Sequence, residues 1–267
     1  MGKYQFGFIG CGNMGGALAS AAAKTIAAKN LAVCDADPEK VAAFVRGGQA
    51  SAANAAEVAR ESDFLFLAVK PQGLAALFEQ IRPVLRARRD RYVLVSMAAG
   101  VPIARVRELA GGEDPVIRIM PNTPVRVGEG MTVYATADVS ETEVSAFLTG
   151  MREAGRFEPL PEKWIDAAGA LSGCGPAFVY LFAEAMADGG VECGLPRGQA
   201  SLFAAQTLAG AAKMLLETKE SPAVLKDAVC SPGGTTIAGV HALEAAGFRG
   251  AVMDAIRAAF DKTAKLG

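Results

Sequence analysis

The chain has 267 residues, 51% of them hydrophobic, and a formal net charge of -1. This length and composition predict a sizeable core in one large or two smaller domains. Charges of both signs are spread along the chain, so no basic stripe indicates nucleic-acid binding and no polybasic tail indicates a membrane surface. No apolar run looks long enough to span a bilayer, and a strand is expected almost at the start, so we expect neither a membrane span nor a signal peptide.

The cysteines are five in number and have no C-x-x-C spacing. An odd count without such spacing favours small buried residues in a reducing compartment over a disulfide framework or a zinc site. We therefore expect a cytoplasmic protein without a bound metal. The five are Cys11, Cys34, Cys174, Cys193 and Cys230.

An apolar run near the N-terminus ends in a G-x-G-x-x-G turn, and apolar residues at helical spacing follow it. Strand, glycine turn and helix in this order predict a dinucleotide-binding site, whereas a glycine turn that binds nothing is the alternative. Gly10 allows the sharp turn, Gly12 lets backbone approach a pyrophosphate, and Gly15 lets the helix pack against the strand. The first helical turn, with Asn13 and Met14, would present N–H groups to the phosphates.

Asp35 follows Gly15 by about twenty residues and ends the next apolar run, residues 31–34. A carboxylate at this position is typical of the group that accepts hydrogen bonds from the adenosine ribose hydroxyls. It would repel a 2′-phosphate, which favours NADH. Lys40 and Arg46 are close enough in sequence to reach a phosphate, so both NADH and NADPH remain open as cofactors.

Beyond Asp35, short apolar runs alternate with segments of helical spacing. Continuous apolar runs of this length are typical of parallel strands buried on both faces. The alternation predicts an α/β domain with a Rossmann-type, doubly wound, mostly parallel sheet over residues 1–161. Strands are expected at residues 64–69, 92–96, 116–120, 131–134 and 157–160, and helices at 37–45, 55–59, 74–81, 102–109 and 144–151.

Several polar or small residues follow the ends of these expected strands. Because ligands of such sheets bind beyond the carboxyl ends of the strands, we expect Asp35, Lys70, residues 98–100 and Asn122 with Thr123 to converge on one crevice. Lys70 is interpreted as a ligand of cofactor phosphate or ribose, with a solvated surface charge as the alternative. Asn122 lies between two prolines, so a plain turn former is as good an interpretation as a site residue.

From residue 162 onward the pattern is helical throughout, and we place a domain boundary between residues 161 and 162, with an all-α domain at 162–267. Gly and Pro at residues 172–176 predict a break or sharp kink in the first of these helices. The next helix begins with residues 178–182, which are apolar all round. Such a helix must be buried on every side, which favours packing into a second subunit over a monomeric bundle.

Two glycines and two threonines open a later helix of this domain. Gly233, Gly234, Thr235 and Thr236 form a pattern typical of a backbone nest for an anion such as a carboxylate. An ordinary helix connection with threonine caps is the alternative. His241, the one histidine of the chain, is interpreted as a helical residue without a catalytic role, and no nucleophile triad or metal cluster is visible.

Five stretches in this order resemble the Δ1-pyrroline-5-carboxylate reductase family, and the resemblance covers nearly the whole chain. The stretches are FIGCGNMG at residues 8–15, AVKP at 68–71, MPNTP at 120–124, LSGCGPA at 171–177, and KD with SPGGTT within 226–236. The resemblance implies reduction of a cyclic imine to L-proline by hydride from NADPH or NADH, in proline biosynthesis. It also implies an obligate homodimer, often assembled into decamers.

The resemblance implies which residues bind the two ligands. It implies that Thr236 hydrogen-bonds the substrate's ring nitrogen and is the catalytic residue. The expected substrate-binding residues are Gly233, Gly234, Thr235, Thr236, Asn122 and Ser172. The expected cofactor-binding residues are Gly10, Gly12, Asn13, Met14, Gly15, Asp35, Asn54, Ala68, Val69, Lys70, Pro71, Ala98, Ala99 and Gly100.

The chemistry suits a site without a committed histidine. A protonated imine already carries the positive charge that hydride quenches, so reduction needs positioning more than a strong acid. One departure from the family pattern is Cys174, where the family more often has serine, and a thiol is a weaker donor than a hydroxyl. Two rivals remain: a 3-hydroxyacid dehydrogenase using Lys213 or Lys226 as its acid, and a non-enzymatic dinucleotide sensor.

Overall fold

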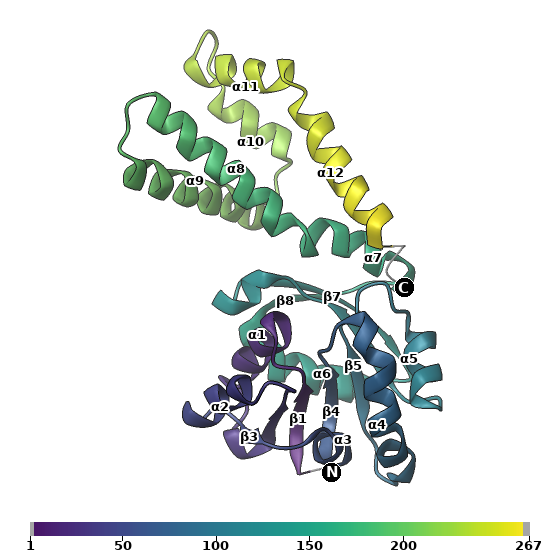
Figure 1. Ribbon diagram of the computed structural model, residues 1–267. Coiled ribbons are helices and arrows are strands. Elements are labelled where there is room, and N and C mark those ends of the chain that lie inside the picture. Colours follow the sequence, from purple (N-terminus) through teal and green to yellow (C-terminus); the bar gives the residue numbers. More distant parts are fainter. Residues whose placement is uncertain (1–2, 264–267) are drawn as a thin grey trace. The chain divides into compact units, whose positions relative to one another are not determined.

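The computed structural model describes residues 3–263, which form two compact units (Figure 1). The first unit extends along the chain to Cys174 and resumes at Ala259, and the second unit is Gly175–Ala258. The division expected between residues 161 and 162 remains a prediction.

An eight-stranded sheet with the order β3-β2-β1-β4-β5-β6-β7-β8 forms the centre of the first unit (Figure 1). All neighbours pair in parallel except β6 and β7, which are antiparallel. This topology confirms the Rossmann-type, doubly wound fold, with its switch point between β1 and β4. The strands are β1 (Tyr4–Ile9), β2 (Leu31–Cys34), β3 (Ser51–Ala52), β4 (Ser62–Leu67), β5 (Val93–Ser96), β6 (Val116–Met120), β7 (Gly130–Ala137) and β8 (Gly155–Pro159).

The helices of this unit connect the strands across both faces of the sheet. They are α1 (Asn13–Ala22), α2 (Pro38–Arg46), α3 (Ala55–Glu61), α4 (Leu74–Ala87), α5 (Ile103–Ala110), α6 (Glu141–Met151) and α7 (Ile165–Ala168). Side chains start several of them as the sequence predicts: Asp37 accepts a hydrogen bond from the N–H of Glu39, and Asn54 accepts one from the N–H of Glu57. These caps fix the points where the chain leaves the sheet.

Three details of this unit differ from the sequence-based expectations. The two-residue strand β3 was not predicted, because a strand this short leaves no apolar run. Helix α1 ends at Ala22, and beyond it the Thr25 hydroxyl donates to the Gly150 carbonyl at 2.5 Å, so the helical spacing up to Ile26 overstated its length. Strand β7 is longer than expected and antiparallel to β6.

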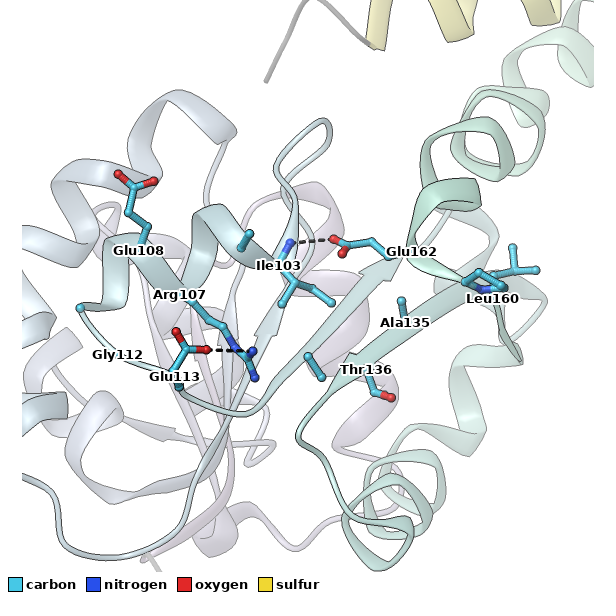
Figure 2. Close-up of a pocket in the computed structure, with 13 residues that line it drawn as sticks. Ile103, Arg107, Glu108, Gly112, Glu113, Ala135, Thr136, Leu160 and Glu162 are labelled. Atoms are coloured by element: carbon cyan, nitrogen blue, oxygen red, sulfur yellow. Dashed lines mark hydrogen bonds and ion pairs between the residues drawn. The ribbon is translucent and has the colours of Figure 1, made fainter.

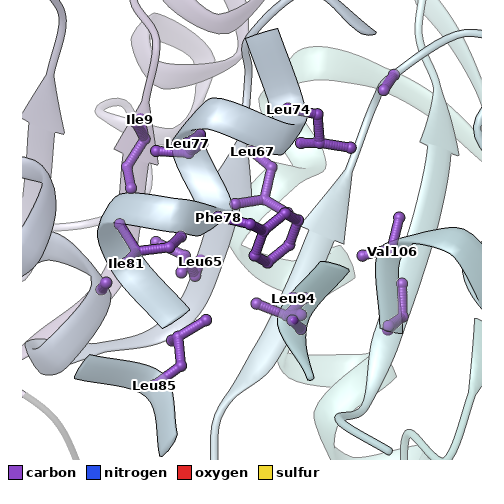
Figure 3. Packing of buried hydrophobic residues seen from close by; sticks show 14 of the residues in the cluster. Ile9, Leu65, Leu67, Leu74, Leu77, Phe78, Ile81, Leu85, Leu94 and Val106 are labelled. Carbon is purple, nitrogen blue, oxygen red and sulfur yellow. The ribbon is translucent and has the colours of Figure 1, made fainter. Parts of the chain in front are cut away.

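The core of the first unit lies in two layers, one on each face of the sheet. On one face, Leu65, Leu67 and Leu94 of the strands pack under Phe78 and Ile81 of α4 (Figure 3). The other face buries aromatic rings, the largest being Phe6, Phe8, Phe66 and Phe147. Burial on both faces explains why the strand sequences are continuous apolar runs rather than alternating ones.

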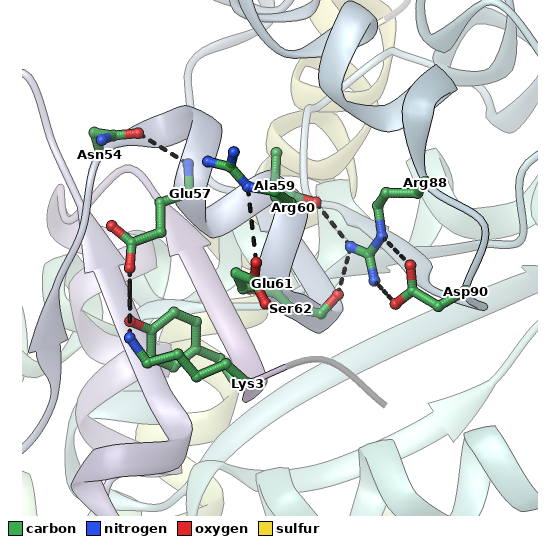
Figure 4. A network of polar contacts seen from close by, with 10 residues as sticks. Lys3, Asn54, Glu57, Ala59, Arg60, Glu61, Ser62, Arg88 and Asp90 are labelled. Carbon is green, nitrogen blue, oxygen red and sulfur yellow. Dashed lines mark hydrogen bonds and ion pairs between the residues drawn. The ribbon is translucent and has the colours of Figure 1, made fainter.

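Polar side chains stabilise the edge of the sheet where the parallel strands begin (Figure 4). The buried guanidinium of Arg88 donates to the carbonyls of Ala59 and Ser62 at 2.7 and 2.8 Å, and it forms a two-pronged ion pair with Asp90. These bonds fix α3, β4 and the approach to β5 to one another. The loops that carry the predicted site residues lie at the opposite edge, where strands β1, β2, β4, β5 and β6 end.

The second unit is all-helical, as predicted. Its helices are α8 (Gly175–Glu192), α9 (Arg197–Thr218), α10 (Pro222–Val229), α11 (Thr235–Ala245) and the larger part of α12 (Phe248–Thr263), whose residues from Ala259 onward belong to the first unit. Helix α12 was not predicted from the sequence. Where a break or sharp kink was expected, at residues 172–176, the structure has a π-helical turn, Gly169–Gly173, that leads into α8. A π turn absorbs the local disturbance without ending the helix.

The helix that runs through the π turn corrects the expectation that no apolar stretch is long enough to span a bilayer. One helical stretch within residues 3–263, Glu162–Glu192, is long and apolar enough by length and composition to cross a membrane. Only 11% of its most apolar window is buried within the single chain. A helix that packs against another subunit meets the same criteria, because it too must be apolar on every side.

Candidate active site

The glycine turn between β1 and α1 has the geometry that two of its glycines require. Gly10 has φ +107°, and a Cβ on it would lie 2.3 Å from the Ala68 carbonyl oxygen. A Cβ on Gly15 would lie 2.2 Å from the Gly10 carbonyl oxygen. Around Gly12, in contrast, a Cβ would meet no atom within 4 Å. A side chain would therefore clash with the protein at Gly10 and Gly15. The space at Gly12 is open, as backbone contact with a pyrophosphate requires.

No side chain among the described residues caps the N-terminus of α1. Gly12 is its N-cap and supplies no side-chain cap, and its first turn has no acidic residue. The first N–H groups of the helix, from Asn13 onward, have no helical partner. Together with the positive end of the helix dipole, they make this end a site for an anion such as a phosphate.

Asp35 directly follows β2, and its carboxylate binds the backbone of the glycine turn. One carboxylate oxygen accepts the Cys11 N–H at 2.6 Å, and the other accepts the Asp37 N–H at 2.9 Å and lies 3.6 Å from Lys40 Nζ. Burial by itself would raise the pKa of Asp35, but these N–H groups and the Lys40 ammonium outweigh it and lower the pKa. Asp35 is thus a fixed negative charge at the edge where the sequence predicted a ribose-binding acid.

Cys11, within the turn, is buried and its pKa is raised to about 12 by burial and by the nearby Asp35 charge. Its thiol remains protonated at neutral pH and donates to the Cys34 carbonyl. Cys11 is therefore a packing residue rather than a nucleophile.

A cavity of about 990 Å³ opens beside the glycine turn. It brings together the ends of β1, β2 and β4 with the loop before α3, so Asp35 and Lys70 share it as predicted. Residues 98–100, Asn122 and Thr123, which were expected in the same crevice, do not line this cavity. The predicted cofactor residues that line it are Gly10, Gly12, Asp35, Asn54, Ala68, Val69 and Lys70. Helix α4 adds a wall with Ala76 and Gln80 that was not predicted, because its only signal in the sequence is helical spacing around Leu77.

The other predicted cofactor residues lie outside this cavity's lining. Met14 and Gly15 belong to α1, and Pro71 begins the 3-10 turn Pro71–Gly73. After β5, Ala98 is buried and its carbonyl accepts the Val101 N–H at 3.3 Å, while Gly100 has φ +75°. This tight turn keeps Ala99 and Gly100 at the same sheet edge as the glycine turn, because β4 and β5 are parallel neighbours.

Two predicted substrate residues, Asn122 and Ser172, are hydrogen-bonded to each other. The Asn122 amide nitrogen donates to the Ser172 carbonyl at 2.9 Å, and its amide oxygen accepts the Met131 N–H at 2.9 Å. The Ser172 hydroxyl donates back to the Ala168 carbonyl at 2.9 Å. Asn122 is buried, so these bonds join the end of β6, the start of β7 and the π-helical turn. Both side chains fix backbone at this point.

In the second unit, Gly233 and Gly234 form the turn before α11. Gly233 has φ +67°, and a Cβ on Gly234 would lie 2.3 Å from the Ser231 hydroxyl oxygen. Gly234 is the N-cap and offers no side-chain cap, so the N–H groups of Thr235 and Thr236 have no helical partner. Both threonines are exposed within the single chain. The turn has the conformation and free donors of an anion nest.

A separate depression of about 670 Å³ lies between α5 and β7, and none of the predicted site residues lines it (Figure 2). Its cation, Arg107, is already engaged by the Asp114 carbonyl at 2.9 Å and by Glu113 and Asp138. At its rim Glu162 accepts the Ile103 N–H at 2.6 Å. Arg107 and Glu162 are therefore already engaged by other groups of the fold.

The two lysines that the dehydrogenase rival requires are each paired with a nearby carboxylate. Lys213 is exposed and pairs with Glu217 one helical turn away, and Lys226 pairs with its neighbour Asp227. His241 is exposed on α11. No group of three or more potential metal ligands occurs among residues 3–263.

The fold and the glycine-turn site define a dinucleotide-binding protein of the Rossmann class with a helical second unit. Two family models match the chain: "NADP oxidoreductase coenzyme F420-dependent" over residues 5–100 and "Pyrroline-5-carboxylate reductase dimerisation" over residues 162–266. The pyrroline-5-carboxylate reductase of Escherichia coli is 43% identical over 98% of both chains. That of Pisum sativum is 39% identical, covering 99% of this chain and 96% of its own.

Among solved structures, the pyrroline carboxylate reductase of Plasmodium falciparum with NADP bound superposes with a TM-score of 0.88 at 33% identity. The match covers 100% of this chain and 99% of that one. The chain belongs to the pyrroline-5-carboxylate reductase family. It is an NAD(P)H-dependent oxidoreductase that forms a homo-oligomer.

Proposed function

We propose that this chain reduces 1-pyrroline-5-carboxylate to L-proline with NADPH or NADH, in proline biosynthesis. One observation carries the proposal: the 43% identity to the Escherichia coli reductase extends over 98% of the chain, so it includes both the dinucleotide cavity and the Gly233–Thr236 turn. A similarity confined to the first unit would support only dinucleotide binding.

The bound dinucleotide supplies a hydride, which carries two electrons to the carbon of the substrate's C=N bond. The electron pair of that bond moves to nitrogen, and the positive charge of the protonated imine disappears. No alkoxide forms, so the residues around the imine need not stabilise a new negative charge. Their task is to hold the substrate with its C=N carbon within reach of the hydride donor.

The individual residue roles are proposals. The glycine turn, Asp35 and the strand-end residues that line the 990 Å³ cavity would hold the dinucleotide. The free N–H groups at the start of α11 would bind the substrate carboxylate, and the Thr236 hydroxyl would hydrogen-bond the ring nitrogen. Asn122 and Ser172 would support the substrate site by fixing backbone.

The finer assembly and location are also proposals: a homodimer, further assembled into a decamer, in the cytoplasm. The apolar surface of α8 supports the dimer, since Tyr180 and Leu181 are 63% and 68% exposed in the single chain. The mixed charge pattern gives no reason to expect a nucleic-acid or membrane partner. The five free cysteines agree with a reducing compartment.

The direct test is an assay of the purified enzyme with 1-pyrroline-5-carboxylate and each dinucleotide, in which oxidation of the dinucleotide and formation of proline are both measured. We expect equal amounts of the two products. A 3-hydroxy acid with the oxidised dinucleotide is the control for the dehydrogenase rival. Tight dinucleotide binding without turnover of any imine would instead favour the sensor.

Variants of Thr236 test the role proposed for its hydroxyl. Thr236→Ala removes the proposed hydrogen bond that positions the substrate and should lower kcat about 100-fold, because a misplaced C=N carbon lies out of reach of the hydride. Thr236→Ser should recover most of the activity, and both variants should bind dinucleotide as the wild type does. The matched control is Thr218→Ala, which removes a hydroxyl that donates to the Met214 carbonyl in the same unit. Wild-type kinetics in Thr236→Ala would exclude Thr236 from the reaction.

A further inference from the structure

A second cavity, of about 510 Å³, lies on the other side of the glycine turn, along α1. Gly12 lines both cavities, so the two cavities meet at the open space beside Gly12. Two cations, Lys40 and Arg126, line the second cavity, and no acidic residue does. Together with the uncapped start of α1, this cavity presents an excess of positive charge beside Gly12.

Arg126 reaches this place from a distant part of the chain. It belongs to the 3-10 turn Thr123–Val127, which follows β6. Its guanidinium donates to the side-chain oxygen of Asn13, the first residue of α1, at 3.2 Å. The guanidinium is therefore positioned at the helix end that the dinucleotide phosphates would occupy.

The turn that carries Arg126 is held in place by core packing and by a backbone hydrogen bond. Its neighbour Val125 is 1% exposed and packs into the core, and a Cβ on Gly130 would lie 2.4 Å from a methyl group of Val125. The turn closes at Gly128, whose φ is +81° and whose N–H donates to the Val125 carbonyl at 3.1 Å. A side chain on such a support loses less entropy on binding a ligand than one on a mobile loop.

The charge of Arg126 is not neutralised within the described chain. No carboxylate of residues 3–263 forms an ion pair with it, whereas Lys40 lies 3.6 Å from Asp35 and 3.7 Å from Asp37. One N–H group of the guanidinium is used by Asn13, and the other donors of its planar fork remain for a ligand. That fork matches the geometry of a phosphate.

We propose that Arg126 is a cofactor-binding residue that holds the pyrophosphate of the dinucleotide, acting with the N-terminus of α1. The proposal rests on the proposed function only in that the ligand is a nicotinamide dinucleotide. NADH and NADPH share the pyrophosphate, so Arg126 strengthens the binding of both. Discrimination between them belongs to Asp35 and its partner Lys40, on the ribose side.

The test is equilibrium binding of NADH and NADPH to the substrate-free oligomer, followed by calorimetry or nucleotide fluorescence. Arg126→Gln should weaken both by the same factor, about tenfold, because a charge-assisted contact with an anion is lost. Arg126→Lys should recover part of the affinity. The salt dependence of binding should become shallower in Arg126→Gln, since one cation no longer faces the phosphates. Adenosine, which has no phosphate, should bind all variants equally.

The matched control is Arg152→Gln, an exposed arginine that pairs with its neighbour Glu153 outside both cavities. Unchanged melting temperatures would show that the variants are folded. Unchanged affinity in Arg126→Gln, or a loss confined to NADPH, would overturn the proposal. If the wild type binds dinucleotides but does not reduce 1-pyrroline-5-carboxylate, the proposed function fails while this binding test still gives its answer.

Discussion

The two units differ in how completely they bury their own apolar residues. The first unit encloses large side chains such as Phe6, Phe66 and Phe147 on both faces of its sheet. In the second, the hydrophobic residues that the described chain buries are three alanines, Ala187, Ala200 and Ala204. Large apolar residues on its helices remain exposed in the single chain. The first unit can therefore fold around its own core, whereas the second needs another subunit to complete one.

The largest expected effect comes from breaking the second unit's dependence on a partner. Leu181 lies on α8 and is 68% exposed in the single chain. Leu181→Asp would place a carboxylate in an apolar interface, so we expect the homo-oligomer to dissociate, with its dissociation constant raised at least about 100-fold. Sedimentation velocity measures the change.

The control for this experiment is Val45→Asp, because Val45 is 47% exposed and lies in the first unit. We expect this variant to keep the oligomeric state of the wild type. An intact oligomer in Leu181→Asp would show that α8 is not the surface that holds the subunits together.

The features that the sequence predicted correctly are those set by local pattern, and they occur in both units. The glycine turn, Asp35 and the apolar strands depend on local pattern, and the structure shows the predicted turn and sheet. The all-round apolar start of α8 likewise predicted the homo-oligomer. Such features are set by residues close together in the sequence.

The missed features depend on contacts between distant segments. The Asn122 amide bonds to Met131 and Ser172, and nothing near Asn122 in the sequence announces either partner. A π turn at Gly169–Gly173 is found where local rules predict only a break or a sharp kink from the Gly/Pro cluster. The antiparallel direction of β7 depends on a short connection through the 3-10 turn Thr123–Val127, where a parallel strand would need a crossover.

A smaller effect is expected at the ribose side of the self-contained first unit. Asp35→Ser removes a carboxylate from the cavity and should raise the ratio of kcat/KM for NADPH to that for NADH about tenfold, because repulsion of the 2′-phosphate is lost. Binding of both cofactors should also weaken, since the Cys11 N–H loses its partner at 2.6 Å. Steady-state kinetics with each cofactor give the ratio.

Asp37→Ser is the control for the ribose-side experiment. Asp37 also lies near Lys40, but it does not line the 990 Å³ cavity, and serine preserves its N-cap role. The ratio should stay at the wild-type value in this variant. An unchanged ratio in Asp35→Ser would reject Asp35 as the residue that discriminates between the cofactors.

The smallest effect concerns the stability of the first unit. Glu143, in the first turn of α6, forms a capping box with Ser140 and pairs with Arg91 at 2.8 Å. The Arg91 hydrogen bonds lower its pKa from 4.5 to about 2, against the effect of partial burial and with help from Ser140. The folded state therefore binds this proton less tightly than the unfolded state. The resulting stabilisation is complete above the unfolded pKa and disappears as the pH falls toward 2.

Glu143→Gln keeps a residue that can complete the capping box but loses the charge that faces Arg91. We expect it to lower the free energy of unfolding by about 1 kcal/mol at neutral pH, a modest value because Arg91 is 57% exposed. Urea unfolding near neutral pH and at about pH 3 should show the difference shrinking with acid. Glu141→Gln removes a charge from the same helix turn but breaks no pair with Arg91. It should therefore lower the free energy of unfolding by only a few tenths of the loss expected for Glu143→Gln. A loss in Glu143→Gln that stays constant with pH would mean that the lost stability comes from packing rather than from the ion pair.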